Sequence, residues 1–361
     1  MRFSREKAAV LLVGGIISIL WVVVGGCRAQ DPVWLDPVPT SSPPSETDSS
    51  QLIEVYFTDP DLPGFRGGPD RALVEAIDRA RYQVDGALYD FNLWSIRNAL
   101  LRAHQRGVKV RLVVETDALD REEIQELIEA GIPAASDQQP GLMHNKFFII
   151  DASEVWTGSM NYTLNGAYRH LNNLVRLRSP LLAENYTVEF EEMFLDGCYG
   201  EIAIDNTPYP RLTLDGLQVE TYFSPDDRTA DRIASLLSGA EESIDFLYYA
   251  YTADELGQLM VAKAQQGVRV RGVLDAYQHR AGLGSEYDYL QAAGLDVRLD
   301  EYREKMHHKV IILDGEVVIT GSANLTRSAD TINDENTLIL FDPRVAEIFL
   351  GEFEWIYAGA E

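Results

Sequence analysis

Residues 143–151 read MHNKFFIID, and residues 306–314 read MHHKVIILD. Both begin with Met-His-x-Lys and continue into an apolar run, which is typical of a strand buried on both faces. Each is followed by a second shared segment, TGSMNYT at 157–163 and TGSANLT at 320–326. Matching residues of these segments stand 163 positions apart, so the sequence predicts one structural unit that occurs twice.

The duplication continues upstream of these segments, where RGVKVRLVVE at 106–115 matches QGVRVRGVLD at 266–275. A repeat of this length has the size of a domain, whereas solenoid units are much shorter. We therefore expect two similar halves, residues 52–205 and 206–361, joined in one chain.

Helix and strand patterns alternate in each half. In the first half, apolar residues at helical spacing indicate helices at 73–81, 96–105 and 124–130, and apolar runs indicate strands at 84–89 and 108–114. Such alternation predicts an α/β fold with a mainly parallel or mixed sheet. We expect the two halves to pack about a pseudo-twofold axis.

The repeated segments carry side chains that suit phosphate chemistry. Alternate residues of a strand share a face, so His144 lies beside Lys146 and His307 beside Lys309, while the residue between them faces away. A lysine ammonium binds phosphate oxygens. A neutral histidine can attack phosphorus, and a protonated one can donate to the leaving oxygen. One half supplies only one such histidine, so a complete site needs both halves, and a monomer is sufficient for activity.

The second shared segment adds a hydroxyl and an amide in each half, on one face by the same parity. A hairpin would lay that face beside the histidine and lysine. Hydroxyl and amide groups also donate to phosphate oxygens. No convincing set of metal ligands is present, and the lysines are poor neighbours for a cation. The predicted reaction needs neither metal nor cofactor. The residues concerned are Ser159, Asn161, Ser322 and Asn324.

This spacing resembles the HKD motif of the phospholipase D superfamily, and the resemblance covers roughly residues 52–361. It implies two α/β halves with the active site at their interface, and a ping-pong phosphodiesterase mechanism through a phosphohistidine. Analogy with two-motif members favours His144 as the nucleophile. The catalytic residues that it implies are His144, Lys146, Asp151, His307, Lys309 and Asp314, and the phosphate-binding residues are Ser159, Asn161, Ser322 and Asn324.

The two aspartates of the motif differ from the other residues in their position. They lie on the opposite parity, at the end of the strand, and Asp314-Gly315 has the composition of a hairpin turn. This assigns Asp151 and Asp314 to positioning rather than proton transfer, with a purely structural role equally open.

Three functions fit the motif. A phospholipase D acting on phospholipid of the phosphatidylcholine, phosphatidylethanolamine or cardiolipin class, with phosphatidic acid as product, is favoured by the membrane tether described below. An endonuclease cutting DNA or RNA is favoured by small size and by the basic strands at 106–111 and 269–271. The formal charge of −26 disfavours it, because an acidic chain repels phosphates. A non-catalytic envelope binding module is disfavoured by the intact motifs.

The N-terminus has the pattern of an export signal. Three basic residues precede the uncharged stretch 8–26, and Val24-Gly25-Gly26-Cys27 resembles a bacterial lipoprotein box. We expect residues 1–26 to be a cleaved signal and Cys27 to carry lipid, in preference to an uncleaved membrane anchor. Residues 27–51 are rich in proline and serine and are expected to be a tether. Either reading places the protein in the cell envelope, exported and membrane-anchored.

Composition limits the class of protein and the kinds of site that the chain can form. Hydrophobic residues make up 46% of the chain and charged residues 24%, which is typical of a globular protein. Two cysteines exclude a disulfide scaffold and a cysteine-rich zinc site. With lipid on Cys27, we expect Cys198 to be buried and unpaired within the mature domain.

For several residues outside the motif, the sequence allows both a role in the site and a purely structural role. Asn173, Glu335 and Asn336 either orient the histidines or only pack. Aromatic residues near strand ends either line a substrate entrance or belong to the core, and the second is favoured. Three histidines have no partner in the repeat and are expected at the surface. The aromatic residues are Tyr89, Phe91, Trp94, Tyr248, Tyr249 and Tyr251, and the histidines are His104, His170 and His279.

Overall fold

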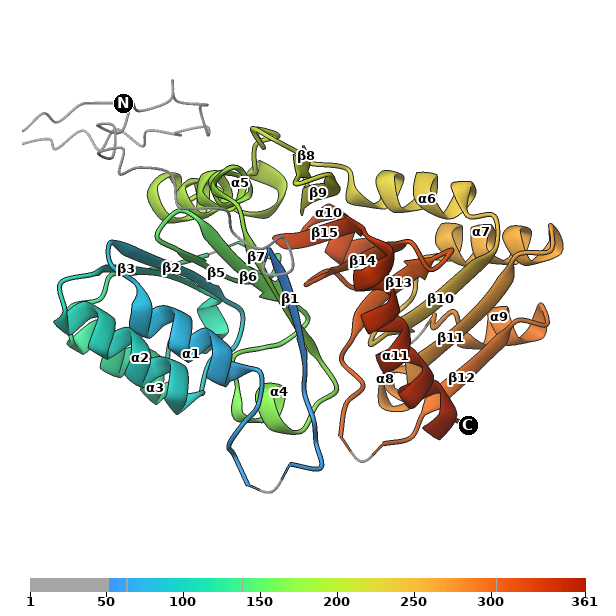
Figure 1. Cartoon of the computed structure of the whole chain (residues 1–361), viewed down its shortest axis with the longest axis horizontal. Helices are drawn as coiled ribbons and strands as arrows, with labels where there is room; N and C mark the ends of the chain where they lie inside the picture. Colours follow the sequence, from blue (N-terminus) through green and yellow to red (C-terminus); the bar gives the residue numbers. More distant parts are fainter. Residues whose placement is uncertain (1–51, 63, 138, 283, 303) are drawn as a thin grey trace, which may run out of the picture.

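A computed structural model describes residues 52–361, except positions 63, 138, 283 and 303 (Figure 1). The expected signal or anchor at 1–26, the lipidation site Cys27 and the tether up to residue 51 lie outside the described residues. Within the described part, no helix has the length and apolar character needed to cross a membrane.

The first half is a seven-stranded mixed sheet with the strand order β1-β7-β6-β5-β2-β3-β4. The neighbours β2, β3 and β4 run parallel, and the remaining neighbours are antiparallel. Its elements are β1 (Ile53–Phe57), α1 (Asp70–Arg79), β2 (Gln83–Leu88), α2 (Trp94–Gln105), β3 (Lys109–Val114), α3 (Glu122–Glu129), β4 (Ala134–Ser136), β5 (Lys146–Ile150), β6 (Glu154–Gly158), α4 (Leu164–Tyr168), β7 (Asn173–Arg178) and α5 (Pro180–Glu191).

The second half repeats this order as an eight-stranded sheet, β12-β11-β10-β13-β14-β15-β9-β8, in which β8 is an added edge strand. Its elements are β8 (Arg211–Leu214), β9 (Leu217–Ser224), α6 (Thr229–Gly239), β10 (Ser243–Tyr248), α7 (Asp254–Gln265), β11 (Arg269–Asp275), α8 (Ala276–Ala281), α9 (Tyr287–Ala292), β12 (Asp296–Asp300), β13 (Lys309–Leu313), β14 (Val317–Gly321), α10 (Arg327–Thr331), β15 (Glu335–Phe341) and α11 (Pro343–Gly359).

The α/β fold class with two similar halves is confirmed, and the sheets are mixed. The antiparallel strand β5 pairs with β2 in the first half, as β13 pairs with β10 in the second. Both β5 and β13 are fully buried, as their continuous apolar runs predict. The repeated Met-His-x-Lys segments therefore enter the central strands of their sheets.

The two halves share one hydrophobic core. Residues of β5, β7 and α5 pack in a single cluster with residues of β13, β15 and α11. The outer face of each sheet has a core of its own, beneath α1, α2 and α3 in the first half and beneath α6, α7 and α9 in the second (Figure 1). Burial of apolar side chains between the two sheets therefore stabilises the contact between the halves.

The helices α5 and α11, which pack in the core shared by the two halves, begin at equivalent positions. Each starts with a capping side chain followed by a proline. Ser179 accepts a hydrogen bond from the backbone N–H of Leu182 (3.2 Å), and Pro180 is the first residue of α5. Asp342 caps α11 in the same way through the N–H of Arg344 (2.8 Å), again before a proline. A capping side chain followed by proline fixes where a helix starts. Both helices thus start directly after β7 and β15, the strands that line the interface.

Hydrogen bonds across the interface repeat with the same pseudosymmetry. The amide of Asn336 accepts from Thr157 (2.6 Å) and donates to Asn145 (2.9 Å), both in the first half. The amide of Asn173 accepts from Thr320 (3.1 Å) and contacts Nδ1 of His308 (3.2 Å) in the second half. Buried polar groups must be paired, and here each half satisfies the other.

The expectation for Cys198 is half wrong. Its side chain is buried, as expected. It is not a free thiol, because the structure records it as disulfide-bonded.

Candidate active site

Each Met-His-x-Lys segment is bound by backbone to the opposite half. The N–H of His144 donates to the carbonyl of Asp334 (3.0 Å), and the N–H of His307 donates to the carbonyl of Leu171 (2.8 Å). These contacts continue as short parallel bridges, Met143 with Asp334 and Leu171 with Met306. Both histidines are therefore held where the halves meet.

A carboxylate of the second half orients His144. Nδ1 of this histidine lies 2.7 Å from both oxygens of Glu335, which is wholly buried. Ser322 donates to the same carboxylate (2.6 Å) and accepts from the N–H of Asn336 (2.9 Å). With its proton on Nδ1, His144 keeps the lone pair of Nε2 unprotonated, as a nucleophile requires.

An amide of the first half orients His307. Nδ1 of this histidine lies 2.9 Å from Oδ1 of Asn172 and 3.1 Å from the carbonyl of Ser159. The hydroxyl of Ser159 donates to the same Oδ1 (3.1 Å). Asn172 occupies the position of the repeat that Glu335 occupies in the second half. The two histidines thus have the same geometry and differently charged partners.

The two lysines are buried beside the histidines, each 1% exposed. Nζ of Lys146 donates to the carbonyl of His144 (2.6 Å) and lies 4.6 Å from the ring centre of Tyr89. Nζ of Lys309 donates to the carbonyl of His307 (3.1 Å) and lies 3.3 Å from its Nε2. This matches the parity prediction that each lysine shares a face with its histidine.

Burial lowers the pKa of all four bases. It lowers the pKa of His144 to about 4 despite the carboxylate of Glu335, and that of Lys146 to about 7. The pKa values of His307 and Lys309 lie well below their ordinary ranges, because burial is joined by repulsion from neighbouring bases. Four buried bases that repel one another form a site that favours an anionic ligand.

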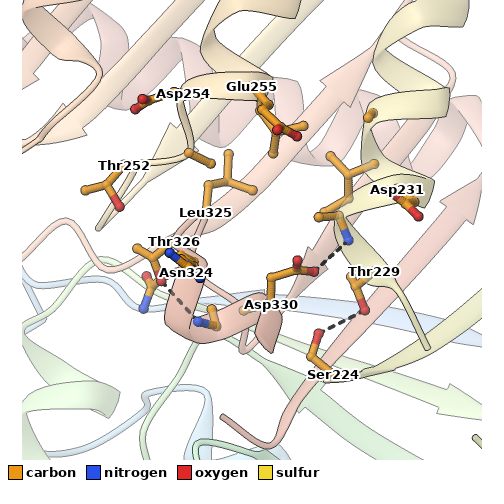
Figure 2. A pocket seen from close by; sticks show the side chains of 18 residues that line it. Ser224, Thr229, Asp231, Thr252, Asp254, Glu255, Asn324, Leu325, Thr326 and Asp330 are labelled. Carbon is orange, nitrogen blue, oxygen red and sulfur yellow. Dashed lines mark hydrogen bonds between the residues drawn. The ribbon is translucent and has the colours of Figure 1, made fainter. Parts of the chain in front are cut away.

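The amides Asn161 and Asn324 each have a buried oxygen, Oδ1, without a partner among the described residues. Figure 2 shows Asn324 in the wall of a cavity of about 550 Å³ between α6, α7 and α10. Oδ1 can only accept, so a phosphate oxygen would be bound by the Nδ2 hydrogens of these amides, and Oδ1 would accept from a donor group of the ligand.

The two serines and the two aspartates predicted for the site have partners other than a phosphate position. The serines bind Asn172 and Glu335, so they hold the partners of the histidines rather than an open phosphate position. Asp151 accepts from three backbone N–H groups at 81–83, and Asp314 accepts from three at 241–243.

These aspartates lie at the far ends of β5 and β13, about 20 Å along the strand from the histidines. Their φ angles are 50° and 53°, and Gly315 follows at 64°, which confirms the turn that the dipeptide Asp314-Gly315 predicts. The structure does not bring Asp151 or Asp314 into the site, and we do not retain them as catalytic candidates.

Two site residues escaped the sequence analysis. Asn172 directly precedes Asn173, and its match to Glu335 in the repeat was the available signal. His170, expected at the surface, is half-buried, and its ring centre lies 6.3 Å from that of His307. Burial and the nearby charge of Lys305 lower the pKa of His170 to about 4. It has no partner in the repeat, so no sequence pattern pointed to it.

The aromatic residues divide between site and core. The ring centre of Tyr89 lies 4.3 Å from that of His144, and that of Tyr249 lies 4.6 Å from that of His307. Phe91, Tyr248 and Tyr251 are buried core residues, and Trp94 is exposed on α2. His104 and His279 are half-buried away from the site. Glu335 orients a histidine, whereas Asn173 and Asn336 join the halves.

Comparison with known proteins places this geometry in context. Residues 73–194 and 233–357 both match the family described as "Cardiolipin synthase, PLD-like domain". The human protein named "Mitochondrial cardiolipin hydrolase" is 40% identical over 126 residues, which is 35% of this chain and 50% of the human protein. The protein named "Phospholipase D" of Rickettsia prowazekii is 32% identical over 140 residues, 38% of this chain and 65% of its own.

These alignments cover about half to two thirds of each relative. Among solved structures, phosphatidylserine synthase of Haemophilus influenzae superposes with a TM-score of 0.65 at 13% identity, over 86% of this chain and 87% of its own. At that identity the superposition supports the two-halved fold alone.

Proposed function

The chain belongs to the family of cardiolipin synthase, PLD-like domains, and from this premise we propose that it is a phospholipase D-type phosphodiesterase that hydrolyses phospholipid to phosphatidic acid. The observation that carries the proposal is the convergence of His144, Lys146, His307 and Lys309, all buried, on one interface. Such a cluster binds a phosphodiester anion and supplies a nucleophile and an acid. We take the four residues as the two HKD pairs.

The reaction proceeds in two displacements. Nε2 of His144 attacks phosphorus, a P–N bond forms, and the P–O bond to the headgroup alcohol breaks as His307 gives its proton to the leaving oxygen. His307, now neutral, removes a proton from water, whose oxygen attacks phosphorus while the P–N bond breaks. Phosphatidic acid leaves, and both histidines return to their initial states. Lys146, Lys309, Asn161 and Asn324 bind the non-bridging oxygens.

The partners of the histidines support this division of roles. A phosphorylated imidazole carries positive charge, which the carboxylate of Glu335 at 2.7 Å stabilises on His144. The neutral amide of Asn172 at 2.9 Å gives His307 no such charge, so the imidazolium of His307 releases its proton more readily.

Substrate binding also supplies the charge that the acid needs. Burial and the nearby charges of Lys309 and Lys146 lower the pKa of His307. A bound phosphodiester carries one negative charge, which offsets the repulsion from the two lysines. The pKa of His307 then rises, and His307 enters the reaction protonated.

A burst experiment tests the roles of the histidines. Bis(p-nitrophenyl) phosphate releases nitrophenolate, which leaves without a proton. His307→Asn should therefore retain a stoichiometric burst of nitrophenolate and lose steady turnover, whereas His144→Asn should lose both. Loss of the burst in His307→Asn with retention in His144→Asn would reverse the assignment.

A substrate experiment tests the function. The purified exported region, residues 28–361, is offered phosphatidylcholine, cardiolipin and single-stranded DNA in the presence of EDTA. Release of phosphatidic acid or of a free headgroup supports the proposal. DNA fragments alone would instead support the endonuclease, and turnover of none of the three, or full activity of His144→Ala, would refute the catalytic assignment.

We further propose that the protein is exported and held at a membrane through its N-terminal segment, either by lipid on Cys27 or, where Cys27 is the disulfide partner of Cys198, by the uncleaved apolar stretch 8–26. The support is the lipoprotein-like sequence around Cys27, together with a phospholipid substrate that lies in the same membrane. Cys27 is the other cysteine of the chain, and a sulfur that carries lipid cannot also form a disulfide with Cys198. Mass spectrometry of the N-terminal peptide from the native host distinguishes a lipid thioether from a disulfide-linked peptide.

A further inference from the structure

A second cavity, distinct from that in Figure 2, lies near His307, from which it is separated by His170. It has a volume of about 550 Å³, and its lining includes His170 and Lys305. The ring centre of His170 lies 6.3 Å from that of His307. Nζ of Lys305 lies 5.4 Å from the ring centre of Tyr249, which itself packs on His307. The cavity therefore opens on the acid side of the histidine pair.

The far wall of this cavity is acidic and aromatic. Asp300 and Glu304 line it together with Tyr277 and Tyr302. The ring of Tyr277 is 66% exposed. Arg280, also in the lining, forms an ion pair with Glu301, so its charge is already matched. Away from Lys305, the described lining thus offers carboxylates and tyrosine faces.

Asp300 points to a ligand independently of the other acidic residues. Its side chain is only 7% exposed. Oδ1 accepts from the N–H of Tyr302 (3.3 Å), while Oδ2 is buried and has no partner among the described residues. Burial and the nearby Asp275 raise the pKa of Asp300 to about 6. A buried carboxylate oxygen without a partner is costly, and a cation in the cavity would remove that cost.

The first half treats the equivalent carboxylate differently. Asp137 stands at the position that Asp300 holds in the repeat. Its carboxylate accepts from both the N–H (3.1 Å) and the hydroxyl (2.7 Å) of Thr116. The segment before His144 is closely packed, because a Cβ on Gly141 would lie 2.0 Å from the carbonyl of Ile332. The unpaired carboxylate is thus a feature of the His307 side.

We propose that this cavity receives the leaving alcohol of the substrate and selects an ammonium headgroup, as in phosphatidylcholine or phosphatidylethanolamine, through Asp300, Tyr277 and Tyr302. The inference rests on the proposed function, in which His307 protonates the leaving oxygen. On this proposal, a group that departs from the phosphorus toward His307 passes beside His170 into the cavity. Tyrosine faces with a carboxylate are a recurring receptor for alkylammonium ions.

The test compares headgroups on one protein. Steady-state kcat/KM is measured on mixed micelles of phosphatidylcholine, phosphatidylethanolamine and phosphatidylglycerol, for wild type, Asp300→Asn and Tyr277→Ala. Glu255→Gln, a carboxylate in the cavity of Figure 2, is the matched control. We expect wild type to favour the two ammonium lipids by about tenfold over phosphatidylglycerol, and each cavity variant to bring that ratio toward one.

The outcomes separate this inference from the function on which it rests. Hydrolysis of bis(p-nitrophenyl) phosphate and of all three lipids without preference would overturn the headgroup cavity and leave the phosphodiesterase standing. A preference that survives in a folded Asp300→Asn and in Tyr277→Ala would also overturn it. No hydrolysis of any of these substrates would refute the proposed function itself. Tyr277 lies at the surface, so its variant remains informative if Asp300→Asn does not fold.

Discussion

Replacing Glu335 by glutamine removes one charge from the site and exchanges one of the two oxygens near Nδ1 of His144 for an NH2 group. The amide oxygen can still accept from Nδ1 of His144, and the amide nitrogen can donate to Ser322, whose hydroxyl then accepts. The side chain is wholly buried, so no water replaces the lost charge. The variant therefore isolates the electrostatic contribution of Glu335 to a phosphorylated His144.

The magnitude follows from the geometry. Hydrogen bonds to charged groups contribute roughly 1.5–3 kcal/mol, and the 2.7 Å separation between Nδ1 and the carboxylate is that of a strong one. If that contribution is made mainly to the phosphohistidine and the transition states beside it, kcat should fall roughly 10- to 150-fold. KM should change little, because the lysines and amides bind the phosphodiester.

Rapid-quench kinetics on bis(p-nitrophenyl) phosphate measures the effect on the first step, and circular dichroism checks that the variant is folded. Ser328→Ala, an exposed position on α10, is the control. A folded Glu335→Gln protein with wild-type burst rate and turnover would refute the reasoning, as would a phosphoenzyme found on His307.

Three further outcomes are expected. Asn172→Asp places a carboxylate 2.9 Å from His307 and raises the pKa of that histidine, so the basic limb of the kcat/KM profile should move to higher pH by about one unit; an unmoved limb would contradict its role as the acid. Burial raises the pKa of Glu115 to about 7 from 4.5, so its contribution to stability is full below pH 4.5 and is lost as the pH rises to 7. Glu115→Gln can still accept from the N–H of Met143 (2.7 Å), so it should match wild type in Tm near pH 4 and exceed it at pH 8 by differential scanning fluorimetry, and equal Tm values at pH 8 would argue against an ionised buried carboxylate. Because nucleophile, acid and anion-binding groups are all side chains, turnover should survive a large excess of EDTA over trace metal. Loss of turnover that added metal restores would require another mechanism.

The repeat in the sequence predicted the two-halved fold. The alternation of side chains along a strand predicted which histidine lies beside which lysine. His144 with Lys146, and His307 with Lys309, share a face because a strand alternates with period two, which needs no knowledge of packing. The same parity separated the two aspartates from the site. Each aspartate accepts from three backbone N–H groups, and this role depends on the position of the segments directly before β2 and β10 in the folded chain.

What the sequence could not predict lies across the interface. Glu335 and Asn172 each orient a histidine of the other half, and only the packed sheets bring them there. His170 reaches the site because the adjacent Leu171 bridges to Met306, a contact with no counterpart in local periodicity. The unpaired oxygen of Asp300 depends likewise on how the segment before His307 is placed.

The exchange of histidine partners between halves has a consequence for genetics. A chain with a defective first histidine and a chain with a defective second one each lack a working site. If two such chains form a domain-swapped dimer, one of its two sites contains both wild-type histidines and the partner side chains that orient them. Co-expression of His144→Asn and His307→Asn chains would then restore part of the lost turnover, whereas isolated half-chains would each expose the shared inner core to water.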